Sequence, residues 1–162
     1  MSLRSRQLTL LDSTTRHDAT SSDDYYTPPE VFDALQLTFD LDVASPVGGV
    51  PWIPVKRYLT IEDDSLTHEW DGRIWMNPPF SNTAPFADRF IEHRNGVALL
   101  PTSRAQWFGR LWVSEAAIVH PVASPMFTFV RNGQRQNIYM PVIFAAFGED
   151  CINALSRIGK VR

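Results

Sequence analysis

The sequence predicts one α/β domain whose sheet is mostly parallel and ends in an antiparallel hairpin. Apolar segments with strand periodicity alternate with amphipathic helical segments along most of the 162 residues, an order typical of parallel strands joined by helices. A continuous apolar run at residues 96–101 indicates a central strand covered on both faces. Asn132-Gly133, between two apolar segments, indicates a tight hairpin turn.

Capping residues and alternation define the first elements. Residues 1–23 have little periodicity, so we expect a flexible tail before a domain at residues 24–162. Thr27-Pro28-Pro29-Glu30 has the pattern of a capping box with proline at the first helical position, which predicts a short helix ending at Leu35. Alternating apolar side chains then predict a strand at residues 37–43.

The middle of the chain continues this alternation. Three prolines and two glycines make residues 45–54 an irregular loop. Apolar periodicity predicts short strands at residues 56–61 and 73–76, a helix at residues 85–94 and the central strand at residues 96–101.

The last third predicts one helix and the antiparallel end of the sheet. A second capping-box pattern, Ser103-Arg104-Ala105-Gln106, predicts a helix at residues 105–113. A buried strand is expected at residues 117–122, and the two hairpin strands are expected at residues 126–131 and 138–147.

Composition excludes several classes of protein. Apolar residues make up 44% and charged residues 20% of the chain, as in globular domains. No apolar run approaches the roughly 18 residues of a membrane span, and a single cysteine, Cys151, excludes an internal disulfide and a Cys-rich metal site. The four histidines stand singly, without metal-ligand spacing. We therefore expect a cytoplasmic protein that binds neither metal nor membrane.

The net charge of −3 is unevenly distributed. Residues 1–80 hold 13 acidic and 6 basic side chains, a net charge of −7, whereas residues 81–162 hold 5 acidic and 9 basic ones, a net charge of +4. An acidic half suits a cationic ligand with hydroxyl groups, and a basic half suits phosphates. Arginine and lysine on the solvated ends of helices would produce the same asymmetry.

The most informative segment is Asn77-Pro78-Pro79-Phe80, which follows the apolar residues 74–76. Two prolines fix the backbone and donate no hydrogen, so the neighbouring carbonyl groups stay free and nearly immobile. The Asn77 oxygen and the Pro78 carbonyl can both accept from an amino group, and Phe80 can stack on the planar ring that carries it. The same residues would also suit an ordinary turn that ends a strand.

This segment resembles the (Asp/Asn/Ser)-Pro-Pro-(Tyr/Phe/Trp) motif of the S-adenosylmethionine-dependent amino-methyltransferases. Over residues 24–148 the chain is similar to the short phage-type DNA adenine-N6 methyltransferases (Dam-like). Three further segments support the resemblance and follow the family's order. They are the cofactor-site opening Tyr26-Thr27-Pro28-Pro29-Glu30-Val31-Phe32, the first cofactor strand Phe39-Asp40-Leu41-Asp42-Val43-Ala44-Ser45, and the acidic-x-Leu element Asp63-Asp64-Ser65-Leu66.

The resemblance implies a Rossmann-like (class I) methyltransferase fold for the catalytic domain, with S-adenosylmethionine as cofactor. Open sheets of this kind bind ligands at the carboxyl ends of their strands. Asp42 would lie near the methionine and ribose of the cofactor, and Asp64, or Asp63 if the register shifts by one, would accept from its adenine amino group. The methionine end would be covered by Tyr26, Thr27 and Pro28.

The implied reaction is methylation of adenine N6 in DNA, with Asn77, Pro78, Pro79 and Phe80 as catalytic residues. The target base would leave the duplex and stack on Phe80. Asn77 and the Pro78 carbonyl would accept from its amino group and draw lone-pair density out of the ring. Positioning of the two reactants would supply much of the acceleration.

Two features depart from the family pattern. Ala44-Ser45-Pro46 stands where these sites usually have a glycine-rich turn, and glycines come only at Gly48-Gly49. No acidic residue ends the second predicted strand, where one would hold the ribose hydroxyls, and Glu62 is the nearest candidate.

DNA is the implied partner, in the cytoplasm of a bacterial or phage-infected cell. Basic side chains near the expected rim are the candidates for contact with groove or phosphates. The residues after the motif leave no separate recognition domain, so specificity would be loose or supplied by a homodimer. The candidate DNA-binding residues are Ser81, Asn82, Arg104, Arg110, Arg131 and Arg135.

Other readings remain open at this point. The same motif serves cytosine N4 and planar amino groups in RNA or protein, although the order of motifs favours adenine in DNA. A catalytically silent protein could keep the fold to bind DNA or a partner. A structural α/β domain with a chance motif is the third hypothesis.

Overall fold

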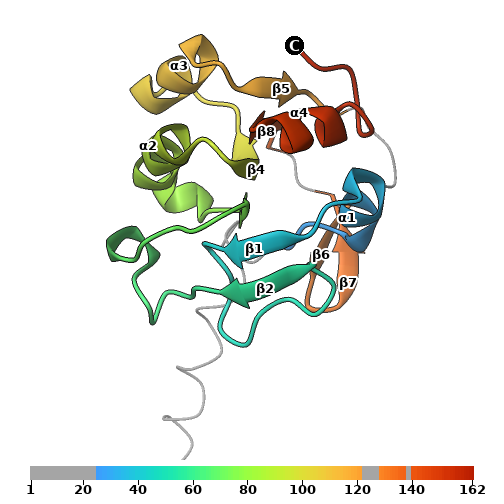
Figure 1. Cartoon of the computed structure of the whole chain (residues 1–162). Coiled ribbons are helices and arrows are strands. Elements are labelled where there is room, and N and C mark those ends of the chain that lie inside the picture. The colour runs from blue at the N-terminus through green and yellow to red at the C-terminus, as the bar shows by residue number, and fades with distance from the viewer. Residues whose placement is uncertain (1–24, 122–127, 138–139) are drawn as a thin grey trace, which may run out of the picture.

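The computed structural model describes residues 25–121, 128–137 and 140–162. A six-stranded sheet with strand order β2-β1-β3-β4-β8-β5 forms its centre (Figure 1). The tail predicted at residues 1–23 lies outside the described residues. The six strands are β1 (Phe39–Asp42), β2 (Val55–Tyr58), β3 (Ile74–Met76), β4 (Gly96–Pro101), β5 (Ala117–Val119) and β8 (Val142–Phe147).

The sheet is mostly parallel, which confirms the predicted fold class at this level. β2, β1, β3 and β4 run in one direction, and β8 runs antiparallel to both β4 and β5. β2 and β3 lie on opposite sides of β1. The chain therefore leaves the carboxyl ends of β1 and β3 toward opposite edges of the sheet, and a crevice opens between the two departing loops.

Helices cover both faces of the sheet. α1 (Pro29–Leu35) and α4 (Glu149–Leu155) cover one face, and α2 (Thr83–His93) and α3 (Gln106–Val113) cover the other (Figure 1). Successive strand residues point to opposite faces. Val97 and Leu99 accordingly belong to the apolar cluster under α1 and α4, here called the first core, and Ala98 and Leu100 to the second core under α2 and α3.

The two predicted capping boxes do not form, although both helices lie where expected. α1 begins at Pro29 after Pro28, so Thr27 is one position too early for its hydroxyl to cap the helix. α3 begins at Gln106, and the Ser103 hydroxyl instead accepts from the Ala105 N–H at 3.0 Å.

The predicted C-terminal hairpin is divided between two sheets. Asn132 and Gly133, with φ of 50° and 73°, join β6 (Phe129–Arg131) to β7 (Gln134–Gln136) in a separate two-stranded sheet. β8 is not the hairpin partner of β6, because a two-residue turn pairs the strands that adjoin it directly. The residues of the predicted strands at 122, 126–127 and 138–139 lie outside the described residues.

One helix, α4, was not predicted. It follows Gly148 and carries Glu149 and Asp150 in its first turn, where acidic side chains favour a helix N-terminus. Cys151, Ala154 and Leu155 are buried in the first core. None of the helices in the described part of the chain has the length and apolar character needed to cross a lipid bilayer.

Candidate active site

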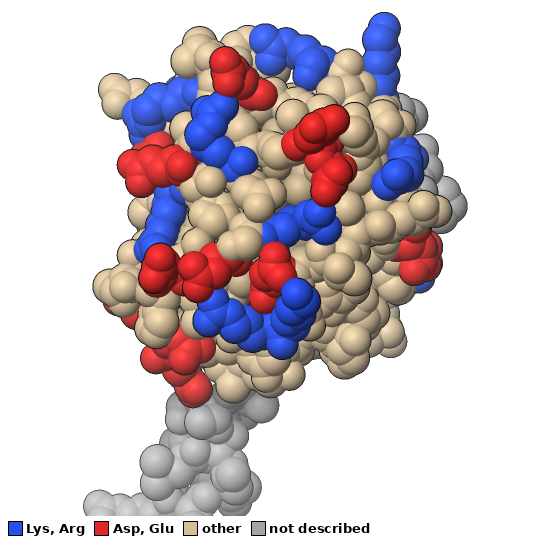
Figure 2. Space-filling view, viewed as in Figure 1, with Lys and Arg blue, Asp and Glu red and all other residues tan. Residues whose placement is uncertain are grey.

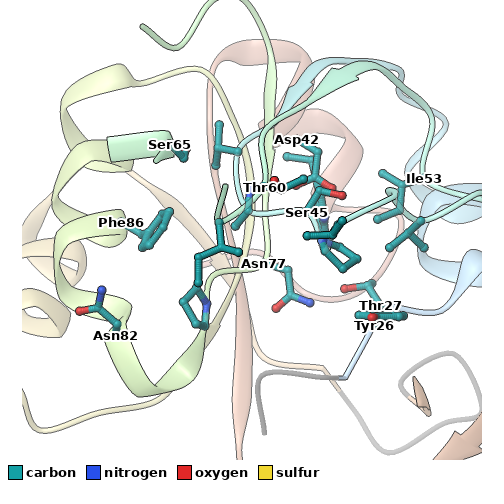
Figure 3. Close-up of a pocket in the computed structure, with 18 of the residues that line it drawn as sticks. Tyr26, Thr27, Asp42, Ser45, Ile53, Thr60, Ser65, Asn77, Asn82 and Phe86 are labelled. Atoms are coloured by element: carbon teal, nitrogen blue, oxygen red, sulfur yellow. The ribbon is translucent and has the colours of Figure 1, made fainter. Parts of the chain in front are cut away.

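A cavity of about 420 Å³ lies where β1 and β3 end (Figure 3). Its lining comes from the segment before α1, from the loops after β1, β2 and β3, and from the start of α2. The crevice between the diverging loops thus becomes a pocket large enough for a small organic ligand. Among the residues predicted for a site, the cavity is lined by Tyr26, Thr27, Asp42, Asp64, Asn77, Pro79 and Asn82.

Asn77 lies near the middle of this lining, directly after β3 (Figure 3). Its side-chain nitrogen Nδ2 donates to the Tyr25 carbonyl over 3.2 Å. Because only the nitrogen of an amide can donate to a carbonyl, this bond determines which way the amide group is turned. Its oxygen Oδ1 is left as a hydrogen-bond acceptor of fixed direction beside the cavity.

The three residues after Asn77 differ in their access to the cavity. Pro79 lines it, Pro78 is buried outside the lining, and Phe80 is half-buried against the first core. The Pro79 carbonyl accepts from the Asn82 N–H at 3.0 Å and so holds the 3₁₀ turn at Phe80–Asn82. Phe80 is therefore next in sequence to the cavity wall but is not part of it.

Asp42 ends β1 and is only 3% exposed. Its Oδ1 accepts from the Ala44 N–H at 3.1 Å. Removal from water raises the pKa of Asp42 to about 7, and the bond from Ala44 offsets only part of this rise. A positive charge favours the ionised form of a neighbouring carboxyl, so this position suits a cationic group of a ligand.

Two buried hydroxyl groups of the cavity wall, those of Thr27 and Ser45, have no hydrogen-bond partner in the described part of the chain. Thr27 is 1% exposed and Ser45 is 6% exposed. A buried hydroxyl without a partner costs free energy that a polar ligand can recover. Ser45 occupies the turn where the family pattern has glycine, and its N–H is already used by the Leu59 carbonyl at 2.9 Å.

The structure separates Asp64 from its acidic neighbours. Asp63 Oδ2 accepts from the Thr60 N–H at 2.8 Å and from the Thr60 hydroxyl at 3.2 Å, which holds the turn after β2. Asp64, with φ of 53°, lines the cavity beside Ser65. Glu62 is exposed and outside the lining. Asp63 and Glu62 thus do not line the cavity. Of the two aspartates predicted for the cofactor site, Asp64 is the one that lines it.

The segment before α1 closes one side of the cavity. Tyr26 belongs to the wall, and its backbone exchanges two hydrogen bonds of 2.8 and 2.9 Å with Val130 of β6. Trp52, from the loop after β1, donates from Nε1 to the Thr27 carbonyl over 2.8 Å. Pro28 is buried outside the lining. The segment is therefore held by two other parts of the chain.

The candidate DNA-binding residues differ in their surroundings. Asn82 lines the cavity, Ser81 lies beside it on the exposed 3₁₀ turn, and Arg104 is exposed just before α3. Arg110 makes two hydrogen bonds of 2.8 Å with Asp88 of α2. On the face seen in Figure 2, acidic and basic side chains lie next to one another rather than in separate patches.

Both hairpin arginines face the segment around α1. Arg135 forms a two-pronged ion pair with Glu30, one hydrogen bond of which measures 2.9 Å. This pairing lowers the pKa of Glu30 and raises that of Arg135. The guanidinium carbon of Arg131 lies 5.3 Å from the centroid of the Tyr25 ring.

The chain resembles known proteins over most of its length. The chain matches the family model described as DNA N-6-adenine-methyltransferase (Dam) over residues 13–140, a span that contains every residue of the cavity wall. The chain belongs to the DNA N-6-adenine-methyltransferase (Dam) family.

A phage relative of this Dam-family chain is the DNA N-6-adenine-methyltransferase of Haemophilus phage HP1 (strain HP1c1). The two are 31% identical over 105 residues, which is 60% of this chain and 58% of the relative. The chain thus spans less than two thirds of the length of this curated relative. No solved structure matches it. Membership of a methyltransferase family implies a methyl donor.

Sequence reasoning missed part of this Dam-family cavity. Ser45 and Thr60 each lie within three residues of a strand end, a signal shared by many loop residues that have no site role. Phe86 lies in the helix predicted at residues 85–94, where helical periodicity alone would place it in the core, and its half-buried ring lines the cavity. A helix that borders a pocket shows the same apolar period as one that only covers a core.

Proposed function

We propose that this chain transfers the methyl group of S-adenosylmethionine to the N6 amino group of adenine in DNA. The observation that carries the proposal is one cavity that combines the directed Asn77 oxygen with the buried Asp42 carboxyl. The oxygen suits an amino group, and the carboxyl suits a cation. Membership of the Dam family supports both the reaction and its substrate. The enzyme would act in the cytoplasm of a bacterial or phage-infected cell.

The strand arrangement supports a Rossmann-like, class I methyltransferase fold. The cavity lies at the carboxyl ends of three neighbouring parallel strands, β2, β1 and β3, and the antiparallel strand β8 lies between β4 and β5. Ligands of open α/β sheets bind where the chain departs from neighbouring strands in opposite directions. The cavity occupies that place between β1 and β3.

The residues of the cavity fit S-adenosylmethionine. This cofactor has two positive groups, two ribose hydroxyls and an apolar purine face, and when bound it supplies an electrophilic methyl group. The Asp42 carboxyl would hold a positive group, and the unpartnered Thr27 and Ser45 hydroxyls would gain hydrogen-bond partners. Asp64 would accept from an amino group. Apolar contact would come from Val50, Ile53, Ile61 and Leu66.

Asn77 prepares the target nitrogen in this proposal. Its oxygen and the Pro78 carbonyl would accept the two amino hydrogens of an extruded adenine, so the nitrogen lone pair is withdrawn from the ring and becomes nucleophilic. Phe80 directly follows Pro79 of the cavity wall and is half-buried, and the exposed part of its ring would stack on the base. No strong base is required, because the nitrogen becomes acidic as it is alkylated.

The test is transfer of labelled methyl from S-adenosylmethionine to unmethylated duplex DNA, with cofactor binding measured in parallel. We expect label in N6-methyladenine and a loss of at least about 100-fold in Asn77→Ala, which removes a positioned acceptor. Asn153→Ala, on the exposed side of α4, serves as control and keeps the parent rate. Transfer by Asn77→Ala near the parent level would overturn the role of Asn77. Cofactor binding without label on DNA would point to an RNA or protein substrate, and neither activity to a binding protein.

A further inference from the structure

The direction of the Asn77 amide depends on one backbone carbonyl, that of Tyr25. Asn77 Nδ2 donates to this carbonyl over 3.2 Å, and the two residues are 52 positions apart in the sequence. Without this hydrogen bond, the amide can rotate about its last side-chain torsion, which is broad and roughly two-fold. The rotated amide would present its NH₂ group, and an NH₂ group cannot accept from the amino group of a substrate.

Tyr25 is itself held by the β6–β7 hairpin. Its ring packs against the first core and under the Arg131 guanidinium, whose carbon lies 5.3 Å from the ring centroid. Its hydroxyl lies 3.5 Å from Gln136 Oε1, at the outer limit of a hydrogen bond. The next residue, Tyr26, is tied to Val130 by two backbone hydrogen bonds of 2.8 and 2.9 Å. Backbone and ring contacts from the same hairpin thus fix the position of the Tyr25 carbonyl.

The third tie runs between the hairpin and α1. Arg135 of β7 pairs with Glu30 in the first turn of α1, five residues after Tyr25 in the sequence. The segment at residues 25–30 is therefore contacted by both strands of the hairpin. Docking of the hairpin and direction of the Asn77 amide are linked through Tyr25.

We propose that Tyr25 is a positioning residue for Asn77, and that it makes the reactive amide depend on the docked β6–β7 hairpin. This inference rests on the proposed function, because the amide direction matters only when an amino group must be bound. It assigns a role to a residue outside the Asn-Pro-Pro-Phe segment. It also explains why a hairpin outside the main sheet is attached so close to the cavity.

The kinetic test compares three substitutions at one position. Tyr25→Ala removes the ring under Arg131, Tyr25→Leu keeps apolar bulk against the first core, and Tyr25→Phe keeps the aromatic face. We expect kcat to fall by about tenfold in Tyr25→Ala and Tyr25→Leu, with KM for DNA and Kd for S-adenosylmethionine within about threefold of the parent. Tyr25→Phe keeps the parent kcat. Tyr58→Ala, the same truncation on β2, is the control.

The second readout does not require activity. The two Nδ2 hydrogens of Asn77 give a pair of NMR signals, identified by their loss in Asn77→Ala. In the parent, the hydrogen facing Tyr25 should exchange slowly with water, and in Tyr25→Ala and Tyr25→Leu both should exchange rapidly while the other backbone signals and the melting temperature stay near the parent values. Tyr25→Phe should keep slow exchange.

The two readouts separate this inference from the proposed function. An unchanged Asn77 exchange rate in Tyr25→Leu overturns the positioning role, and so does an unchanged kcat. A rise in KM or Kd that accounts for the whole loss of rate also overturns it, because a positioning defect acts in the bound complex. If the parent transfers no methyl group to any substrate, the proposed function fails, and the exchange measurement alone decides whether Tyr25 directs the amide.

Discussion

Asp42 holds the most unusual charge environment in the described part of the chain. Its carboxyl is buried at the end of β1, and a single backbone N–H, that of Ala44, donates to it. The resulting pKa of about 7 means that, without a bound ligand, the Asp42 carboxyl is largely protonated below neutral pH. A cationic ligand would bind best to the ionised form. Its affinity should therefore increase as pH rises through about 7.

The same shift predicts how stability depends on pH. The folded pKa of Asp42 lies above its unfolded value of 3.8, so the folded state binds more protons between about pH 4 and about pH 7, and stability falls as pH rises through this range. The full shift corresponds to a loss of up to about 4 kcal/mol. Asp42→Asn, which cannot ionise, should lack this loss. Urea unfolding at pH 4.5 and pH 8 measures it.

The expected outcome is a gap between variant and parent that widens with pH. Asp42→Asn should be close to the parent in free energy of unfolding at the low pH and clearly more stable at the high pH. Asp71→Asn, at an exposed aspartate of the surface pair with Arg57, should leave the pH profile of the parent nearly unchanged. A parallel profile for parent and Asp42→Asn would contradict the assignment of the shift to Asp42.

Single residues were predictable where a strand end decided their position. Asp42 lies near the end of a segment of alternating apolar residues, and Asn77 directly follows an apolar run. Both patterns predict a position at the carboxyl edge of a parallel sheet, and both residues line the cavity. Thr27 was assigned a capping role because the pattern fits, yet Pro28 and Pro29 move the helix start by one residue. The choice between Asp63 and Asp64 depends on a local turn with positive φ at Asp64, which periodicity does not reveal.

At the level of elements, the β6–β7 hairpin carries arginines that already have acidic or aromatic partners. Arg135 contacts Glu30, and Arg131 contacts the Tyr25 ring. A DNA phosphate must compete with these contacts. To bind a phosphate, each arginine of the hairpin would have to give up its present contact within the protein. The free energy lost with that contact reduces the affinity gained from the phosphate.

Release of Arg135 is the corresponding prediction. Glu30→Gln removes the carboxylate that holds the guanidinium, so we expect DNA affinity to rise by about threefold to tenfold at low salt, with one more phosphate contact reflected in a salt slope steeper by about one. Fluorescence anisotropy with a labelled duplex over a series of salt concentrations measures both quantities. The exposed ion pair contributes little to stability, so the melting temperature should change only slightly.

A matched substitution separates this local effect from net charge. Glu92→Gln removes the same charge from an exposed position on α2 and leaves Arg135 paired. It should raise affinity less than Glu30→Gln does and leave the salt slope unchanged. Equal effects of the two variants would show that Arg135 does not reach DNA.

The elements themselves were predictable to different degrees. Every α-helix and β-strand up to β5 was predicted from the local sequence pattern, β4 with the ends it has in the structure and most others with ends shifted by a few residues, whereas the short 3₁₀ turns were not predicted. The pairing of β8 with β4 and β5 was not predicted, because it depends on contacts between residues far apart in the sequence and no local pattern indicates it. α4 was not predicted because its buried face includes Cys151 and Ala154, whose small side chains give only a weak apolar periodicity.

For the whole molecule, the close packing of β3 against β4 depends on a glycine. Gly96 opens β4 with φ of 153°, and a Cβ there would lie 2.3 Å from the Ile74 carbonyl oxygen. Both the backbone conformation and the lack of space exclude a side chain. The two strands that meet here contribute to both cores, and β3 also lines the cavity through Trp75.

Two alanine substitutions of glycine should therefore have opposite effects. Gly96→Ala should lower the free energy of unfolding by about 3 kcal/mol, through overpacking and strain. Gly109→Ala lies in α3, where a Cβ would meet no atom within 4 Å, and should raise it by about 0.5 to 1 kcal/mol. Chemical denaturation of both variants provides the comparison. A stable Gly96→Ala protein with an unchanged cavity would contradict the described strand spacing.

The position of β8 also determines when the sheet can be completed during synthesis. β4 and β5 are separated in the sheet by a strand that is made after both of them. Until residues 142–147 leave the ribosome, β4 remains an open edge with unpaired backbone groups, a form prone to pairing with other chains. β1, which ends at Asp42, and β3, which Asn77 directly follows, are adjacent in the sheet and are made early. β1 and β3 of the nascent chain can therefore pair before β8 completes the sheet. Until β8 is in place, the unpaired edge of β4 is the part of the sheet that chaperones would need to shield.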